Sequence, residues 1–241
     1  MQRLSRKIQQ GARFLSFIPA IAWCLLAFDS TPRPAALPEV LSRMAQHERM
    51  HSSSLLRYTC LRRYTLNNIR FHKQAEVIVR MTYRQPGRKS FEVVSEKGPS
   101  LIRERVLHKM FEAEAEASSD EMRLHTQITP RNYNFELQGM EDCQGRPAYI
   151  LKTHPKVIDK FMMQGRIWVD AEDFAIVRVE ATPAKNPSVL IRNTMVVQQY
   201  SKHGPFWLPL SNRSETDSML FGRTEVLVSS SGYEVTEAAA Q

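Results

Sequence analysis

Cysteine and glycine are scarce in this chain of 241 residues, which holds three cysteines and nine glycines. No CxxC pair is present, which excludes a zinc-ribbon or thioredoxin-type site. The sequence also lacks a GxSxG elbow, a P-loop and a GxGxxG fingerprint. Its single long apolar run excludes a polytopic membrane protein, because each span needs about 20 apolar residues. The remaining composition, 42% hydrophobic and 24% charged, is typical of a globular protein.

The N-terminus has the pattern of an export signal. Four cations (Arg3, Arg6, Lys7 and Arg13) precede an uncharged run at residues 14–28. A helix of that length would reach about 22 Å, against about 30 Å for a bilayer core, so cleavage is favoured over a retained anchor. The expected organisation is a signal peptide or N-terminal anchor at 1–28, a linker at 29–37, one domain at 38–235 and a disordered tail at 236–241. The expected location is the periplasm.

Charge argues against a nucleic-acid partner. The formal net charge is +8, but loss of residues 1–27 with their four cations would leave +4. The basic and aromatic stretch 57–64 alternates like a strand, so a stacking platform for bases is not needed to explain it. A cationic rim that meets an anionic membrane surface is the better functional interpretation of its arginines.

The two cysteines beyond the signal allow two interpretations. Oxidising compartments permit disulfides, so Cys60 and Cys143 could pair in an exported protein. Alternatively, they are two separate small apolar residues. They lie far apart in the sequence, one in an expected strand and the other beside an expected turn.

Hydrophobic periodicity divides the rest of the chain into helices and strands. Apolar residues recur every three or four positions near residues 37–45 and within 100–117, which predicts a helix at each place. The acidic stretch 112–120 is expected to be solvated. Elsewhere apolar and polar residues alternate, which predicts antiparallel strands joined by turns. The strands are expected at 57–64, 75–83, 91–95, 133–137, 149–153, 163–169 and 177–181, with at least four more between 188 and 235.

A sheet of nine or ten consecutive strands must twist and curl, and each strand has one apolar face that needs cover. Two helices are too few to cover such a sheet completely, so we expect an apolar hollow that suits a hydrophobic ligand. The inward positions follow from the alternation, and a register error of one residue would invert them. The predicted cavity residues are Val77, Val79, Met81, Phe91, Tyr149, Leu151, Ile167, Val169, Val177 and Val179.

Two segments resemble a known family. These segments are GRIWVDAEDFAIVRVEA (165–181) and QQYSKHGPFWLPLSNRSET (198–216). In them, and in the order of its expected helices and strands, the chain resembles the LolA-like periplasmic proteins, which sort outer-membrane lipoproteins. The resemblance covers roughly residues 38–235. It implies a mainly β (α+β) fold, in which a highly curved antiparallel sheet forms an unclosed half barrel with helices in its concave face. It also implies a carrier of lipid or lipoprotein acyl chains.

One catalytic pattern is present, the HExxH of His47-Glu48-Arg49-Met50-His51. On a helix this spacing places both imidazoles on one face, where they could bind zinc while the glutamate acts as general base. No convincing third ligand follows, so a solvated helix end is the favoured interpretation and a zinc metallopeptidase is a remote alternative. We therefore expect a protein without catalytic residues, metal or cofactor. A second alternative is an envelope sensor or interaction module that binds a protein partner with the same fold.

Overall fold

The computed structural model describes residues 35–118, 120–159, 161–186 and 189–238. The predicted signal peptide at 1–28 lies outside these residues, as does most of the predicted linker. Within the described ranges, no helix combines the length and the apolar character needed to cross a membrane.

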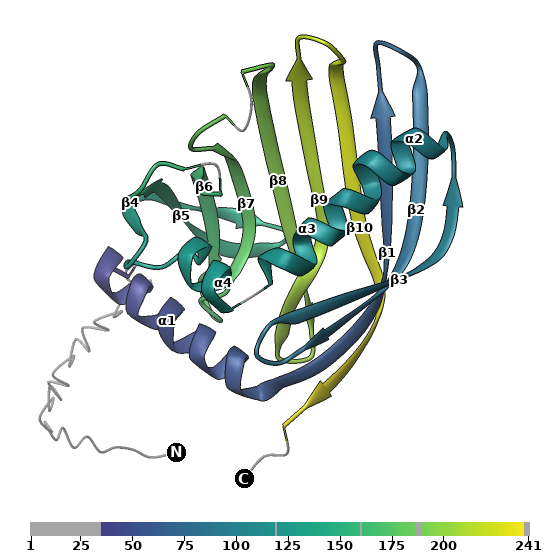
Figure 1. The fold of residues 1–241 in the computed structure, drawn as a ribbon. Helices are drawn as coiled ribbons and strands as arrows, with labels where there is room; N and C mark the ends of the chain where they lie inside the picture. The colour runs from purple at the N-terminus through teal and green to yellow at the C-terminus, as the bar shows by residue number, and fades with distance from the viewer. Residues whose placement is uncertain (1–34, 119, 160, 187–188, 239–241) are drawn as a thin grey trace, which may run out of the picture. The chain divides into compact units, whose positions relative to one another are not determined.

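Ten strands form one sheet whose neighbours are all antiparallel. The spatial order is β3-β2-β1-β10-β9-β8-β7-β6-β5-β4, so β3 and β4 are the two edges and the sheet does not close into a barrel. Figure 1 shows the sheet curving around the helices. The predicted open, curved antiparallel sheet is thus confirmed. The strands are β1 (Leu55–Asn68), β2 (Lys73–Arg84), β3 (Arg88–Lys97), β4 (Tyr133–Cys143), β5 (Arg146–Pro155), β6 (Met163–Asp170), β7 (Ile176–Pro183), β8 (Ile191–His203), β9 (Phe206–Ser218) and β10 (Gly222–Glu237).

The C-terminal part of the sheet has fewer and longer strands than the sequence predicted. At least four short strands were expected between residues 188 and 235, and the structure has three long ones, β8, β9 and β10. Irregularities explain the difference, because the β8–β9 register shifts at Gln199/Tyr200 and the β1–β10 register shifts at Thr59/Leu61. A bulge breaks the alternation of side chains without ending the strand.

Two helical segments cover different parts of the inner face of the sheet (Figure 1). The helix α1 (Leu37–Ser54) continues well beyond the predicted residues 37–45 and passes directly into β1. The predicted helix at 100–117 is confirmed as a continuous run of α2 (Ser100–Ile102), the π-helical turn η1 (Arg103–His108) and α3 (Lys109–Ala117). A further short helix, α4 (Asp120–Thr126), follows.

Each helical segment has its own hydrophobic core. Leu107 and Phe111, from η1 and α3, pack on an apolar cluster of β1 and β2 that includes Val77 and Val79. The side chains of Val40 and Met44, one helical turn apart on α1, pack on a separate cluster formed by β5 and β6. Burying such apolar surface is the main stabilising contribution to the fold.

The two cysteines stay unpaired, so the disulfide interpretation is wrong for this structure. Cys60 and Cys143 are both free and buried. They belong to different apolar clusters, and their strands β1 and β4 lie far apart in the order of the sheet. Each therefore acts as a small apolar residue.

A buried ion cluster fixes α3 to the sheet, which corrects the expectation that the acidic stretch is simply solvated. Glu114 accepts hydrogen bonds from the guanidinium of Arg62 on β1, at 2.6 Å and 2.7 Å, and from Lys89 Nζ at 2.8 Å. The Arg62 side chain is only 5% exposed. Burial alone would raise the pKa of Glu114, but Lys89 and Arg62 outweigh it and lower that pKa to about 2.

We predict that Glu114→Ala destabilises the protein by about 3 kcal/mol, because it leaves the Arg62 charge buried without its partner. The matched control is Glu112→Ala on the same helix, where Glu112 is exposed and pairs with Lys109 at the surface. This control should cost less than about 0.5 kcal/mol. Urea unfolding followed by circular dichroism measures both values. Equal free-energy changes in the two variants would show that the ion cluster does not anchor α3.

Candidate functional site

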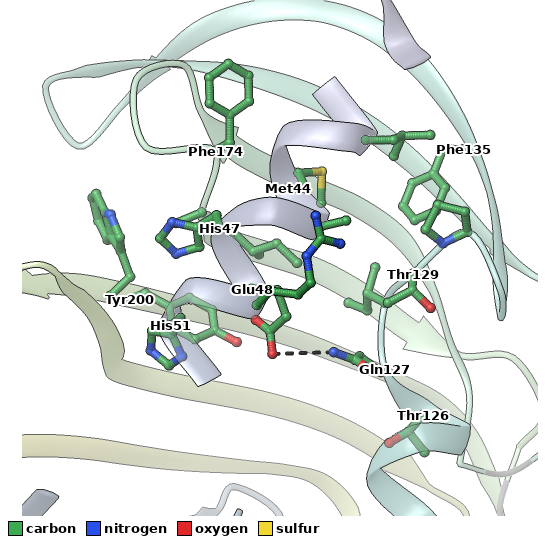
Figure 2. A pocket seen from close by; sticks show the side chains of 18 of the residues that line it. Met44, His47, Glu48, His51, Thr126, Gln127, Thr129, Phe135, Phe174 and Tyr200 are labelled. Carbon is green, nitrogen blue, oxygen red and sulfur yellow. Dashed lines mark hydrogen bonds between the residues drawn. The ribbon is translucent and has the colours of Figure 1, made fainter. Parts of the chain in front are cut away.

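A hollow of about 690 Å³ lies beneath the helix α1, between this helix, the segment that follows α4 and the sheet. Figure 2 shows side chains from these elements converging on it. The sequence predicted an apolar hollow between sheet and helices, whereas the lining of this one is partly polar. Its lining residues are Leu41, Met44, Ala45, His47, Glu48, Arg49, His51, Thr126, Gln127, Ile128, Thr129, Pro130, Phe135, Phe174, Ala175, Ile176, Gln198, Tyr200 and Trp207.

The periodicity of α1 explains why the HExxH residues face this hollow. Met44 is packed on the sheet, and positions three, four and seven residues later lie on the same side of a helix. His47, Glu48 and His51 therefore line the hollow, as Figure 2 shows. The sequence predicted a solvated helix end for them. Glu48 is exposed, in agreement with this prediction, whereas His47 and His51 are half-buried, because α1 runs on to Ser54 and both rings face the protein.

The two histidines sit in surroundings that favour their neutral forms. Their ring centroids are 6.1 Å apart, and the ring of His51 meets the ring of Phe206 edge-on at 5.5 Å. Within the described part of the chain, His51 Nε2 is buried without a hydrogen-bond partner. Burial lowers the pKa of both histidines, and the proximity of His51 lowers that of His47 further.

Glu48 provides the acidic group of the hollow. Its carboxylate accepts hydrogen bonds from Ser52 Oγ at 3.3 Å and from Gln127 Nε2 at 3.4 Å, the second of which Figure 2 marks. The side chain is exposed to the open hollow, yet the surrounding protein still raises the pKa of Glu48 by desolvation. The hollow thus combines weakly basic, weakly acidic and amide groups on one side.

Asp173, in the turn between β6 and β7, forms a charged pair with Lys202 of β8, close enough to His47 to influence its pKa. Asp173 accepts hydrogen bonds from Lys202 Nζ at 2.6 Å and from the Trp207 indole at 2.8 Å. Burial would raise the pKa of Asp173, but these two donors outweigh it and lower that pKa. The Trp207 ring is therefore held in a fixed orientation in the wall of the hollow.

The histidine pair does not make a metal centre here. A structural or catalytic zinc site needs at least three protein ligands. Among the residues that the structure describes, no group of three or more His, Cys, Asp or Glu side chains is arranged to hold a metal ion. Glu48 instead bonds to an amide and a hydroxyl, so the arrangement presents hydrogen-bonding groups to the hollow.

The predicted cavity residues are placed mainly in the packed cores. Val77 and Val79 pack under Leu107 and Phe111, and Met81 lies in a cluster with Phe206 and Leu208. Phe91 packs beside these two clusters, and Val179 beside the α1 core. None of the ten lines the hollow beneath α1, so their binding of a ligand stays a prediction. The four that pack with α1 in its core are Tyr149, Leu151, Ile167 and Val169.

Val177 departs from the expected face. It was assigned to the same face as Val179, but it packs with Trp168 and Trp207 in another cluster. The β6–β7 register shifts between Trp168 and Val169, so the two-residue alternation fails at this point. A sequence pattern cannot reveal such a bulge.

Several lining residues were missed because they lie outside regular alternation. Phe174 has a positive φ of 57° in the β6–β7 turn, Thr126 ends α4, and Gln127 to Pro130 belong to the connection after it. Tyr200 follows a register shift. The only signal for them was the presence of large apolar residues in or beside predicted turns.

A smaller hollow of about 350 Å³ lies beside the ion cluster. Arg62, Lys89 and Glu114 line it together with polar side chains of the central strands, including Gln198 and Asn212. The middle of the inner face is therefore polar, whereas the parts under α1 and under η1–α3 are apolar.

No protein-family profile matches the chain, and no curated protein matches it. Among solved structures, the chain is similar to an outer-membrane lipoprotein-sorting protein domain from Vibrio parahaemolyticus, at 12% identity and a TM-score of 0.42 over 84% of this chain and 94% of that one. It is similar to a LolA superfamily protein from Nitrosomonas europaea, at 11% identity and a TM-score of 0.43 over 85% and 95%. It is also similar to a DUF1329 family protein from Desulfovibrio piger, at 11% identity and a TM-score of 0.41 over 85% and 94%. The expected LolA-like resemblance is thus confirmed as a resemblance of fold.

We predict that the histidines make the protein less stable in acid. Because burial lowers the pKa of His47 and His51 in the folded state, the unfolded chain binds protons more readily. Their contribution to stability is complete above about pH 6.5, the usual histidine pKa, and is lost as the pH falls through the lower folded-state values.

Urea unfolding between pH 8 and pH 5.5 tests this prediction. The loss of unfolding free energy towards acid pH should be smaller in His51→Gln than in the wild type. His154→Gln changes an exposed histidine of β5 and should retain the wild-type slope. If His51→Gln has the same pH dependence as the wild type, the histidine is not held neutral by its surroundings.

Proposed function

We propose that this protein is an exported, non-enzymatic binder and carrier of lipid or lipoprotein acyl chains, and that the hollow beneath α1 holds the apolar chain. The observation that carries the proposal is a 690 Å³ hollow whose lining combines apolar side chains with several hydrogen-bonding groups. Ligand sites for small molecules typically measure about 300–1,000 Å³ and pair apolar lining with a few polar groups.

The apolar wall supplies the binding energy. Leu41 and Met44 from α1 face Phe135, Ile176 and Trp207 from the sheet and its turns. Each methylene that moves from water into such a wall contributes about 0.8 kcal/mol, so an acyl chain gains affinity with its length. The thioether of Met44 adapts to chains of different shape.

The polar side of the hollow orients the ligand. The amide of Gln127 donates a hydrogen bond to the carboxylate of Glu48, and His47 immediately precedes Glu48 on α1. A polar head that carries both hydrogen-bond donors and acceptors can bond to these groups. Neutral histidines suit an ester or amide head, because neither group carries a charge that needs pairing.

The test is to fill the hollow from α1. Ala45 lines the hollow, whereas Ser42 lies on the exposed side of the same helix. We predict that Ala45→Trp lowers the affinity for dansyl-labelled undecanoic acid by about tenfold or more, since the indole occupies the space of several methylenes. Ser42→Trp should bind the probe like the wild type. Fluorescence titration of the delipidated protein measures both affinities.

Unchanged probe binding in Ala45→Trp, with thermal unfolding like that of the wild type, would contradict the proposal. The proposal would also be contradicted if the delipidated wild type does not bind the probe, or if organic extracts of the freshly purified protein contain no lipid.

A further inference from the structure

Exposed apolar side chains gather where the strands turn at one end of the sheet, which is here called an edge. Consecutive antiparallel strands place the turns β1–β2, β5–β6, β7–β8 and β9–β10 at this edge. Each of the four turns carries at least two large, exposed apolar side chains. This set, called here the apolar turn edge, comprises Ile69, Phe71, Val157, Ile158, Phe161, Val189, Leu190, Met219, Leu220 and Phe221.

The opposite edge is different. The turns β2–β3, β4–β5, β6–β7 and β8–β9 are at that edge, and in their described residues no large apolar side chain is exposed. Phe174 in the β6–β7 turn is 7% exposed, whereas Phe221 in the β9–β10 turn is 59% exposed. Exposed apolar residues scattered over helices and strands, such as Met50 and Leu56, are ordinary, but turns that carry them at one edge alone mark an interaction surface.

Backbone hydrogen bonds connect neighbouring turns of the apolar turn edge. Ile69 donates to the carbonyl of Arg223, at 3.1 Å, and Met219 donates to that of Leu190, at 2.9 Å. The Arg70 guanidinium also donates to the Met219 and Leu220 carbonyls, at 3.4 Å and 3.2 Å, which ties the β1–β2 turn to the β9–β10 turn. These contacts hold the apolar tips of the β1–β2, β9–β10 and β7–β8 turns side by side, in the order that Figure 1 shows along the top of β1, β10, β9 and β8.

Cations surround these tips. The exposed basic residues in and beside the four turns are Arg70, Lys73, Lys156, Lys185, Arg192 and Arg223. Only two acids lie among the described residues of the same stretches: Asp159, which bonds to His125 at 2.7 Å, and Asp217, which lies 3.7 Å from Arg223, so the six cations outnumber the acids. The edge thus carries a net positive charge around its apolar tips.

We propose that the apolar turn edge docks on a membrane that contains anionic lipids and inserts its turn side chains into the interfacial region. Apolar side chains on protruding turns can enter the boundary between headgroups and acyl chains, while neighbouring Lys and Arg side chains stay at the headgroup level. Each cation near an anionic surface contributes about fivefold in affinity. The proposal is independent of the hollow beneath α1, which other residues line.

A probe at a single position tests this proposal in the full-length chain. Residues 14–28 form an apolar run that could adhere to lipid by itself, so bulk binding alone would not identify the surface. In a Cys24→Ser background the remaining cysteines, Cys60 and Cys143, are buried and react poorly with dyes. Leu220→Cys labelled with the environment-sensitive dye NBD reports on the β9–β10 turn, and labelled Glu172→Cys reports on the exposed β6–β7 turn of the opposite edge.

Vesicles of phosphatidylcholine with phosphatidylglycerol should shift the emission of the dye at position 220 to shorter wavelength and leave the dye at position 172 unchanged. The expected shift at position 220 is smaller with phosphatidylcholine alone. The charge variant Lys73→Glu/Arg192→Glu, which changes two exposed cations, should lower the partition of this labelled turn into anionic vesicles about tenfold or more. The same charge variant should leave the partition of the labelled turn into neutral vesicles nearly unchanged.

Removal of the tips is the complementary test. In unlabelled protein, Leu220→Ser/Phe221→Ser should lower the partition into anionic vesicles by about tenfold, because two apolar side chains are lost from the inserted surface. The variant should still bind dansyl-labelled undecanoic acid like the wild type, which shows that the fold and the hollow are intact.

Three results would overturn the proposal. The first is no emission shift at position 220 with either vesicle, as expected if the edge binds a protein. The second is an equal shift at positions 220 and 172. The third is an unchanged partition of Leu220→Ser/Phe221→Ser into anionic vesicles. None of these results bears on the carrier function, because acyl-probe binding is measured without vesicles.

Discussion

The structure depends on one constraint: an open sheet of ten strands must cover its apolar inner face without closing on itself. The two helical segments meet this requirement only where the strands are apolar, with α1 over β5 and β6 and η1–α3 over β1 and β2. The central part is left to polar side chains such as Gln198 and Asn212. Because Glu114 attaches α3 to Arg62 through a buried ion cluster, this segment has a specific position as well as an apolar contact. The hollow beneath α1 is the space that this division of the inner face leaves open.

Alternation predicted β1 and β2 well, because each of these strands keeps one buried face. Ala75, Val77, Val79 and Met81 are buried along β2 as the two-residue period requires. Helix periodicity likewise located the run from Ser100 to Ala117. The pattern failed where a register shift interrupts a strand, as at Val177, and where the strands are too polar to show a period, as in β8 and β9. Such features arise from contacts between strands, which a single segment of sequence does not contain.

The candidate site was harder to predict than the fold, and the reason is physical. Apolar strand positions are the ones that helices cover, so the most regular apolar residues became core and not cavity lining. The hollow is formed where regularity ends: at Phe174 in a turn, at the connection that contains Gln127, and at the inner side of α1 near Glu48. The HExxH spacing correctly placed both histidines on one helix face. Their chemistry follows from the neighbours that the fold brings to them, which include the ring of Phe206 and the amide of Gln127.

The direct passage of α1 into β1 has a mechanical consequence. Ser54 ends the helix and Leu55 begins the strand, with no flexible segment between them. Leu55 is also paired with Glu237, and the Ser54 carbonyl accepts a hydrogen bond from Ala238 at 2.9 Å. The helix is therefore joined rigidly to β1, whose neighbour in the sheet is β10. A movement of α1 away from the sheet would strain the pairing of β1 with β10 at this point. A ligand too large for the hollow would therefore weaken the hydrogen bonds that Ser54 and Leu55 share with the residues at the end of β10.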